Sequence, residues 1–98
     1  MPRLVRHRTN PKFWQFYAQL PEEIQRLADE NYELLKADSR HPSLHFKKVG
    51  RMWSVRVGIH YRATAVEDGS DIVWFWIGHH SLEPMPFAAA PKVRYKPA

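Results

Sequence analysis

The sequence predicts an α+β domain in which two N-terminal helices pack on one face of a small antiparallel β-sheet. Apolar residues recur at helical spacing up to about residue 38, and the hydrophobic period changes to two after His41. The later segments are short, and Gly50, Gly58 and the turn at residues 67–71 separate them without room for crossover helices. Helices followed by neighbouring strands are typical of the α+β class.

The length and charge of the chain limit its organisation and its partners. Its 98 residues suffice for one hydrophobic core, so we expect a single domain over residues 1–83 and a Pro-rich C-terminal tail over residues 84–98. The formal net charge of +5 predicts an anionic partner, either nucleic acid or an acidic protein. Because the chain has no cysteine, disulfides and thiolate sites are excluded.

The N-terminal half is expected to form one short strand and two helices. Residues 3–7, "RLVRH", alternate weakly and predict a short opening strand. Thr9 or Asn10 can cap a helix over residues 11–19, in which Pro11 occupies the first position. A second helix is expected over residues 21–37, with acidic residues near its start and Lys36 near its end. Its apolar stripe consists of Ile24, Leu27, Ala28 and Leu35, with Tyr32 beside it.

Four strands are expected after the helices, over residues 43–49, 52–57, 60–67 and 71–78. Side chains alternate across a strand, so each segment divides into an apolar set facing the helices and a polar set on the open face. The last segment, "DIVWFWIG", is apolar on both sides and is expected to be the central strand or one covered by the tail. The open face is predicted to carry His45, Lys47, Arg56, His60 and Arg62.

The charges on this open face are all of one sign in the sequence. No Asp or Glu occurs between Leu44 and Ala65. Like charges on neighbouring strands repel each other, so a face of this kind predicts an anionic ligand. Two alternatives stay open: a solvated face of an antiparallel sheet, and intramolecular ion pairs of Arg56 and Arg62 with acids of a turn or helix.

Three stretches in order resemble the RelE/ParE toxin superfamily of bacterial type II toxin–antitoxin systems, and its ParE-like branch most closely. They are "FWQFYAQLPEEIQRLA", "HPSLHFKKVGRMWSVRVGIHYRA" and "DIVWFWIGHH", and the resemblance covers residues 9–83. It implies two helices on a small antiparallel sheet and the role of a toxin. The partners that it implies are a cognate acidic antitoxin and either mRNA on the ribosome or DNA gyrase.

The resemblance also assigns roles to individual residues. Arg56 lies at the arginine that RelE-like members use to hold the scissile phosphate, and Arg62 is the arginine of the "YR" motif. His80 matches the histidine that follows "IG", whereas Glu83 stands where the family often has a tyrosine. Lys47 and Lys48 match basic positions of the family, and with Arg51, Arg56 and Arg62 they complete the predicted nucleic-acid-binding set.

Metal-independent endoribonuclease chemistry is the activity that we favour for this residue set. If the 2′-hydroxyl of the RNA attacks the phosphorus, the protein must supply a base, an acid and cations for the developing charge. Arg56 and Arg62 suit the last role, and His80 and Glu83 suit proton transfer. Gyrase poisoning without hydrolysis and an inactive binding module of the same fold remain alternatives.

We expect no metal, no small-molecule cofactor and no membrane association. His79 and His80 are adjacent in a predicted strand, so their rings should point to opposite faces, and a third metal ligand is not evident. The N-terminus has no apolar run and no stretch reaches the length of a membrane span, so a cytoplasmic protein is expected. The tryptophans Trp53, Trp74 and Trp76 are more typical of a core than of base stacking.

Overall fold

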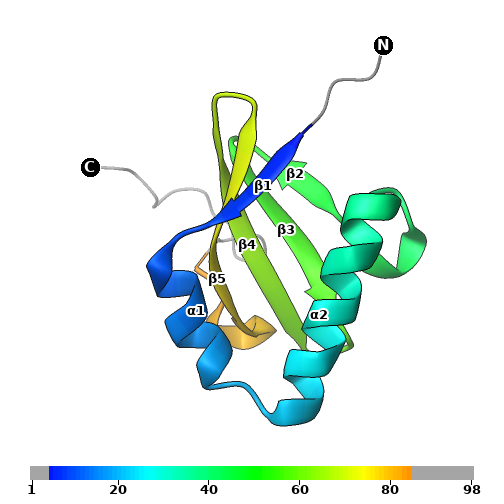
Figure 1. Ribbon diagram of the computed structural model, residues 1–98, viewed down its shortest axis with the longest axis vertical. Helices are drawn as coiled ribbons and strands as arrows, with labels where there is room; N and C mark the ends of the chain where they lie inside the picture. Colours follow the sequence, from blue (N-terminus) through cyan, green and yellow to red (C-terminus); the bar gives the residue numbers. More distant parts are fainter. Residues whose placement is uncertain (1–4, 85–98) are drawn as a thin grey trace.

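The computed structural model describes residues 5–84 and confirms the predicted α+β class (Figure 1). The predicted tail, apart from Pro84, lies outside the described residues. The elements in chain order are β1 (Arg6–Thr9), α1 (Pro11–Ala18), α2 (Glu22–Ala37), the 3₁₀ turn η1 (Pro42–Leu44), β2 (Lys47–Val49), β3 (Met52–Val57), β4 (Tyr61–Asp68), β5 (Asp71–His79) and the 3₁₀ turn η2 (His80–Leu82).

The five strands form one sheet in the order β1-β5-β4-β3-β2. The four strands from β2 to β5 are an antiparallel meander, as their short connections predict. β1 adds to the outer side of β5 in parallel orientation, a pairing that the sequence analysis did not anticipate. Of the two alternatives for the last strand, the central position was wrong, because β4 has the middle position and β5 lies between β4 and β1. The other alternative, a strand covered by the tail, involves residues outside the described part of the chain.

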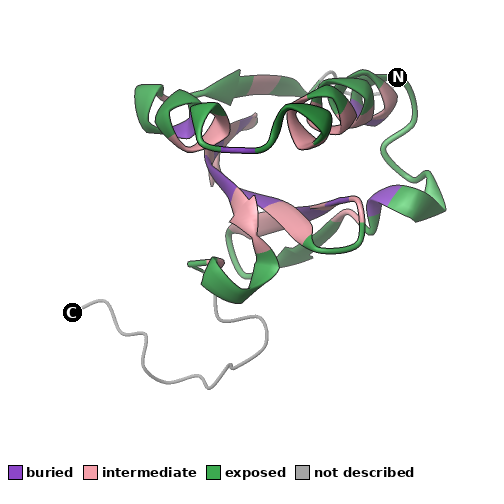
Figure 2. Ribbon diagram, turned by 90° about the horizontal axis from the view of Figure 1, so that it is seen from below, coloured by how far each residue is buried: buried purple, intermediate pink, exposed green. Residues whose placement is uncertain are grey.

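Both helices cover the same face of the sheet, and η2 lies on the other side (Figure 2). The side-chain oxygen of Asn10 accepts a hydrogen bond from the Phe13 N–H at 3.1 Å, which identifies Asn10 as the N-cap of α1. Phe13 is the buried residue of α1, and Leu35 is the buried residue of α2. Ile24, Leu27 and Ala28 complete the predicted apolar stripe of α2 by packing against the core.

A β-bulge divides the two buried tryptophans of β5 between the faces of the sheet. The register between β4 and β5 shifts at Thr64 and Ala65, so that Trp76 is opposite Thr64 while Trp74 is opposite Ala65. Trp74 therefore joins the core under the helices, and Trp76 packs on the open side. Their exposed fractions of 4% and 7% support the prediction that they are structural.

The prediction of a strand over residues 43–49 was only partly correct. Residues 42–44 form η1, because Pro42 fits the first position of a 3₁₀ turn and Nδ1 of His41 accepts the Ser43 N–H. His45 then adopts a left-handed conformation with φ of 47°, and β2 starts only at Lys47. Alternation across residues 44–47 is therefore lost, although Leu44 is still fully buried.

The turn between β3 and β4 needs a glycine for two reasons. Gly58 has φ of +73°, and an added Cβ would lie 2.9 Å from Cδ2 of Leu27. Gly50 has a similar φ of +65°, and nothing lies within 4 Å of its added Cβ. Its substitution by alanine therefore measures the cost of the positive φ alone, without a steric contact. We expect Gly58→Ala to lower the free energy of unfolding by about 2 kcal/mol and Gly50→Ala by about 1 kcal/mol. Urea denaturation measures both values, and equal losses would contradict the role of the Leu27 contact.

Neither of the two helices described within residues 5–84 combines the length and the apolar character that crossing a bilayer requires.

Candidate functional site

Two arginines stand directly opposite each other on the open face of the sheet. Arg56 of β3 and Arg62 of β4 are register partners, and both are half-buried. Opposed like charges on neighbouring strands are unfavourable unless something compensates them. Within residues 5–84 neither guanidinium forms an ion pair with a carboxylate. The alternative of intramolecular ion pairs therefore has no support in the described residues.

The Nε atoms of both arginines are buried and have no hydrogen-bond partner among the described residues. A buried N–H without an acceptor costs about 1–3 kcal/mol, so an arrangement of two such donors is unfavourable in the free chain. An anion with several oxygens can accept from a guanidinium in a bidentate manner. The pair is therefore suited to a phosphate or a carboxylate that comes from outside residues 5–84.

Two neighbouring residues hold Arg56 in place. Nη1 of Arg56 lies 3.3 Å from Nε2 of His45, the residue with the left-handed backbone. The side-chain amide of Asn31 donates to the Arg56 carbonyl at 3.1 Å and ties α2 to β3. Left-handed backbone at a residue other than glycine is strained and often marks a functional site. The strained turn at His45 thus places its imidazole against the guanidinium.

Glu83 changes the predicted charge of the open face. After η2 the chain folds back over the sheet, and Oε2 of Glu83 accepts from the hydroxyls of Ser54 and Thr64 at 2.9 and 2.7 Å. Ser54 and Thr64 are buried register partners, two pairs along the strands from the two arginines and therefore on the same face. The expectation of a single-sign face was wrong, since a residue distant in sequence brings in a fixed carboxylate.

The three remaining basic residues of the predicted binding set separate in the structure. Lys47 is opposite Ser54, so it shares the arginine face. Lys48 is opposite Trp53, on the helix side, and its Nζ lies 3.0 Å from Oε2 of Glu67. Arg51 lies in the turn between β2 and β3 and donates to the carbonyl of Glu67 at 3.2 Å. The geometry therefore brings Lys47, Arg56 and Arg62 together and leaves Lys48 and Arg51 outside this group.

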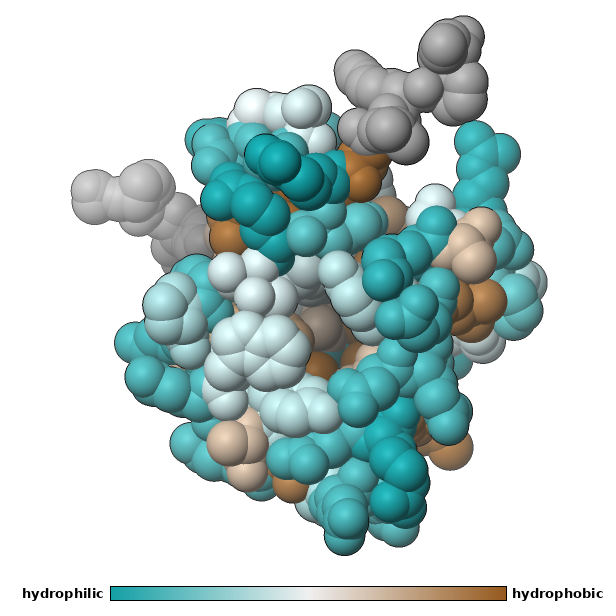
Figure 3. Space-filling model, in the orientation of Figure 1, coloured by the Kyte–Doolittle hydropathy of each residue, from teal (hydrophilic) through white to brown (hydrophobic). Residues whose placement is uncertain are grey.

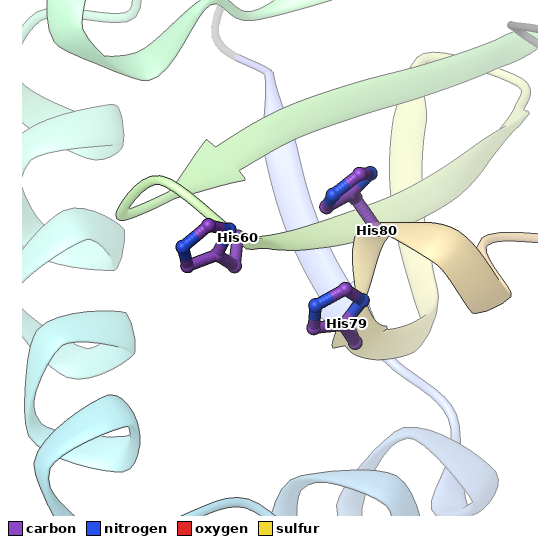
Figure 4. Close-up of side chains that lie close together, drawn as sticks. All are labelled: His60, His79 and His80. Carbon is purple, nitrogen blue, oxygen red and sulfur yellow. The ribbon is translucent and has the colours of Figure 1, made fainter.

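Three histidines gather at the end of β5 (Figure 4). The ring of His80 lies 4.7 Å from that of His79 and 6.3 Å from that of His60, measured between centroids. His60 immediately precedes β4, and its carbonyl accepts the His80 N–H at 2.7 Å. The predicted proton-transfer residue His80 therefore lies in a histidine cluster, at the end of the strand that pairs with Arg62 through Gly78.

An apolar cavity of about 240 Å³ lies on the opposite side of the sheet, between the two helices. Figure 3 shows its mouth as a hollow with apolar groups inside. Core residues such as Val55 and Trp74 form its floor, and the exposed aromatic side chains of Trp14 and Tyr32 stand at its rim. His7 also lines it, and Nδ1 of His7 accepts from Nε1 of Trp74 at 3.1 Å. The sequence did not predict this cavity.

His7 makes stability depend on pH. Burial and, second, the positive charge of Lys36 lower the pKa of His7 below its usual value of 6.5. Between that value and the folded pKa, the unfolded chain binds a proton that the folded chain does not, so stability falls as the pH falls. We expect the loss of unfolding free energy from about pH 7 to about pH 5 to be smaller in His7→Gln, whose amide oxygen still accepts from Trp74. Urea denaturation at both pH values measures this difference, and equal losses would contradict it.

Comparison with solved structures finds strong likeness to three toxin–antitoxin complexes. The chain matches the RelB–RelE complex from Methanococcus jannaschii with a TM-score of 0.61 and 19% identity, over 76% of this chain and 91% of that one. The match to the archaeal RelE–RelB complex from Pyrococcus horikoshii OT3 has a TM-score of 0.60 and 13% identity, and it covers 83% of this chain and 100% of that one. The match to the RelBE2 complex from Mycobacterium tuberculosis has a TM-score of 0.57 and 18% identity, and it covers 76% of this chain and 95% of that one.

The chain has the RelE/ParE-like toxin fold. The fold predicted from the resemblance of residues 9–83 is thereby confirmed. Comparisons with models of protein families and with curated protein sequences give no match. At these identities the likeness concerns the backbone, so the role of each side chain in this RelE-like fold rests on the geometry described above.

Sequence reasoning missed the residues that hold Glu83 and the place of His60 in the histidine cluster. Ser54 and Thr64 could have been found as hydroxyls on the polar side of neighbouring strands, but nothing in the sequence linked them to residue 83. His60 was assigned to the open face, and only the register of β4 with β5 brings it to His79 and His80.

Proposed function

We propose that this chain is the toxin of a toxin–antitoxin pair and cleaves mRNA without a metal ion through the face that carries Arg56 and Arg62. The observation that supports this most is the opposed arginine pair, whose buried Nε groups have no partner within residues 5–84. RNA supplies an anion at every nucleotide, and guanidinium groups bind phosphate with two parallel hydrogen bonds.

In this proposal the arginines bind the scissile phosphate and stabilise the charge of the transition state. Fixed donors in a site of low dielectric constant need no reorganisation during the reaction, so they stabilise developing charge more effectively than water does. Arg56, which His45 contacts, is the first candidate, because it also matches the phosphate-binding arginine of the family resemblance. Lys47, on the same face, provides further positive charge along the RNA backbone.

Glu83 and His80 are the proposed proton-transfer groups. The hydroxyls of Ser54 and Thr64 both donate to Oε2 of Glu83 and so hold its carboxylate in place on the arginine face. A carboxylate held two register pairs from the arginines, on the same face, is suited to take the proton from a 2′-hydroxyl. His80, at the start of η2, is the proposed acid that protonates the leaving 5′-oxygen.

The proposed protein partner is an acidic antitoxin. Each of the three similar structures is described as a complex of a toxin with its antitoxin. A net charge of +5 and an arginine pair without a carboxylate partner in the described residues favour an acidic chain as the inhibitor. In this arrangement the carboxylates of the antitoxin and the phosphates of RNA compete for the same donors.

Mapping of mRNA ends in a bacterial cell-free translation reaction tests the proposal. Purified wild-type chain is expected to produce new 5′ ends by primer extension, and the same amount of Arg56→Ala or His80→Ala is expected to produce far fewer. An intact message with normal protein yield would contradict RNA cleavage. A supercoiling assay with DNA gyrase then distinguishes poisoning of gyrase from an inactive binding module.

A further inference from the structure

We propose that His60, His79 and His80 form a binding site for one divalent transition-metal ion, of the class that includes Zn²⁺ and Ni²⁺. One ring nitrogen from each residue lies within 4.8 Å of the corresponding nitrogens of the other two. Three imidazoles without a thiolate or carboxylate ligand suit zinc, nickel or copper, whereas magnesium and calcium prefer oxygen ligands. This site goes beyond the proposed RNA cleavage, which needs no metal.

The sequence predicted no metal because His79 and His80, as neighbours in a strand, should point to opposite faces. This argument does not hold at the end of β5. Adjacent strand residues point to opposite faces, but β5 ends at His79 and the 3₁₀ turn η2 begins at His80. The turn ends the alternation, so both rings come to one side, as Figure 4 shows. The third ligand, which was not evident in the sequence, is His60.

The backbones that carry the three histidines are held together by the sheet. Tyr61, the residue after His60, is the register partner of His79. The His80 N–H donates to the carbonyl of His60 at 2.7 Å. A metal ion would therefore join segments that are already fixed relative to each other, so little backbone ordering is needed on binding.

The three ring nitrogens, which lie within 4.8 Å of one another, must come closer together to bind one ion. Tetrahedral zinc with Zn–N bonds of about 2.0–2.1 Å requires nitrogens roughly 3.4 Å apart. His60 and His80 are exposed, so the core of the domain does not confine their rings. His79 is already oriented, because its Nδ1 lies 2.9 Å from Oγ of Ser81. In the free chain Nδ1 also accepts the Ser81 N–H at 3.2 Å; a metal at Nε2 would place the ring proton on Nδ1, which would then donate to Oγ of Ser81 instead.

His41 offers a matched control within the same chain. It precedes η1 as His79 precedes η2, and its Nδ1 lies 2.9 Å from Oγ of Ser43, the residue two positions later. His41 therefore reproduces the local environment of His79, but it does not belong to the cluster of three. Substitution of each by glutamine separates the effect of the cluster from that of a single capping histidine.

Calorimetric titration of ZnCl₂ into the tag-free chain tests the site. We expect one ion per chain, a loss of affinity of more than about 10-fold in His60→Gln and in His79→Gln, and no change in His41→Gln. Zinc should also raise the thermal unfolding midpoint of the wild type and of His41→Gln, but not that of His60→Gln. Circular dichroism confirms that each variant is folded.

Three results would overturn the metal site: no binding by the wild type, binding that His79→Gln leaves unchanged, or an equal loss in His41→Gln. The titration contains no RNA, although His80 belongs to both proposed sites. A chain that does not bind zinc would therefore not contradict the proposed cleavage of mRNA. A chain that does not cleave mRNA would likewise not contradict the metal site.

Discussion

Replacement of Arg56 by alanine is expected to lower the rate of mRNA cleavage by about 100-fold or more, the effect of removing a fixed donor from a developing oxyanion. Arg56→Lys is expected to recover only part of this loss, since an ammonium cannot bind phosphate in a bidentate manner. The rate at which new mRNA ends appear, measured at matched protein concentrations, gives both values.

The same variant should keep or gain stability. Arg56 is opposite Arg62, and its Nε–H has no partner among the described residues, so alanine removes a repulsion and a buried donor without an acceptor. Arg26→Ala, on the exposed side of α2, is the control for a general loss of positive charge. A loss of cleavage that accompanies a lower unfolding midpoint would indicate a structural role for Arg56 and contradict the phosphate-binding role.

Two substitutions of Glu83 should separate its structural contribution from its chemical one. Glu83→Ala leaves the buried hydroxyls of Ser54 and Thr64 without their acceptor, and it is expected to lower the free energy of unfolding by about 2 kcal/mol. Glu83→Gln keeps an acceptor oxygen, so its stability should stay close to that of the wild type. Because an amide cannot take up the proton of the 2′-hydroxyl, its cleavage rate should fall by about 100-fold.

Glu30→Gln, at an exposed position of α2, is the control for the change in net charge. Urea denaturation and the rate of appearance of mRNA ends are measured on all four chains, the wild type included. Cleavage by Glu83→Gln at the wild-type rate would exclude Glu83 as the base and leave it with the structural role alone.

The helices and the meander could be predicted because each rests on local chemistry. Asn10 and Pro11 specify the start of α1, and the glycines at positions 50 and 58 occupy turns with positive φ. The failures arose where the outcome depends on distant contacts. The parallel pairing of β1 depends on its fit to β5, and the position of β4 in the middle depends on both edges of the sheet.

The candidate site was predictable as a set of residues but not as a geometry. Alternation correctly placed Arg56 and Arg62 on one face, because both lie inside regular strands. It failed at His80, where a 3₁₀ turn follows β5. His45 does reach Arg56, as predicted, but from a left-handed residue and not from a strand. The return of Glu83 over Ser54 and Thr64 depends on the direction in which the chain leaves η2, which the residues of β3 and β4 do not encode locally.

The central claim is that the half-buried guanidinium groups of Arg56 and Arg62 bind an RNA phosphate. Arginine Nε–H resonances, observed by ¹H–¹⁵N NMR during titration with an RNA oligonucleotide that a 2′-deoxy sugar makes uncleavable, test it most directly. Arg56→Lys and Arg62→Lys assign the two signals, and Arg26 serves as the internal control. We predict that the signals of Arg56 and Arg62 shift on addition of RNA while that of Arg26 does not. Unchanged signals for both arginines, with shifts confined to other residues, would contradict the account.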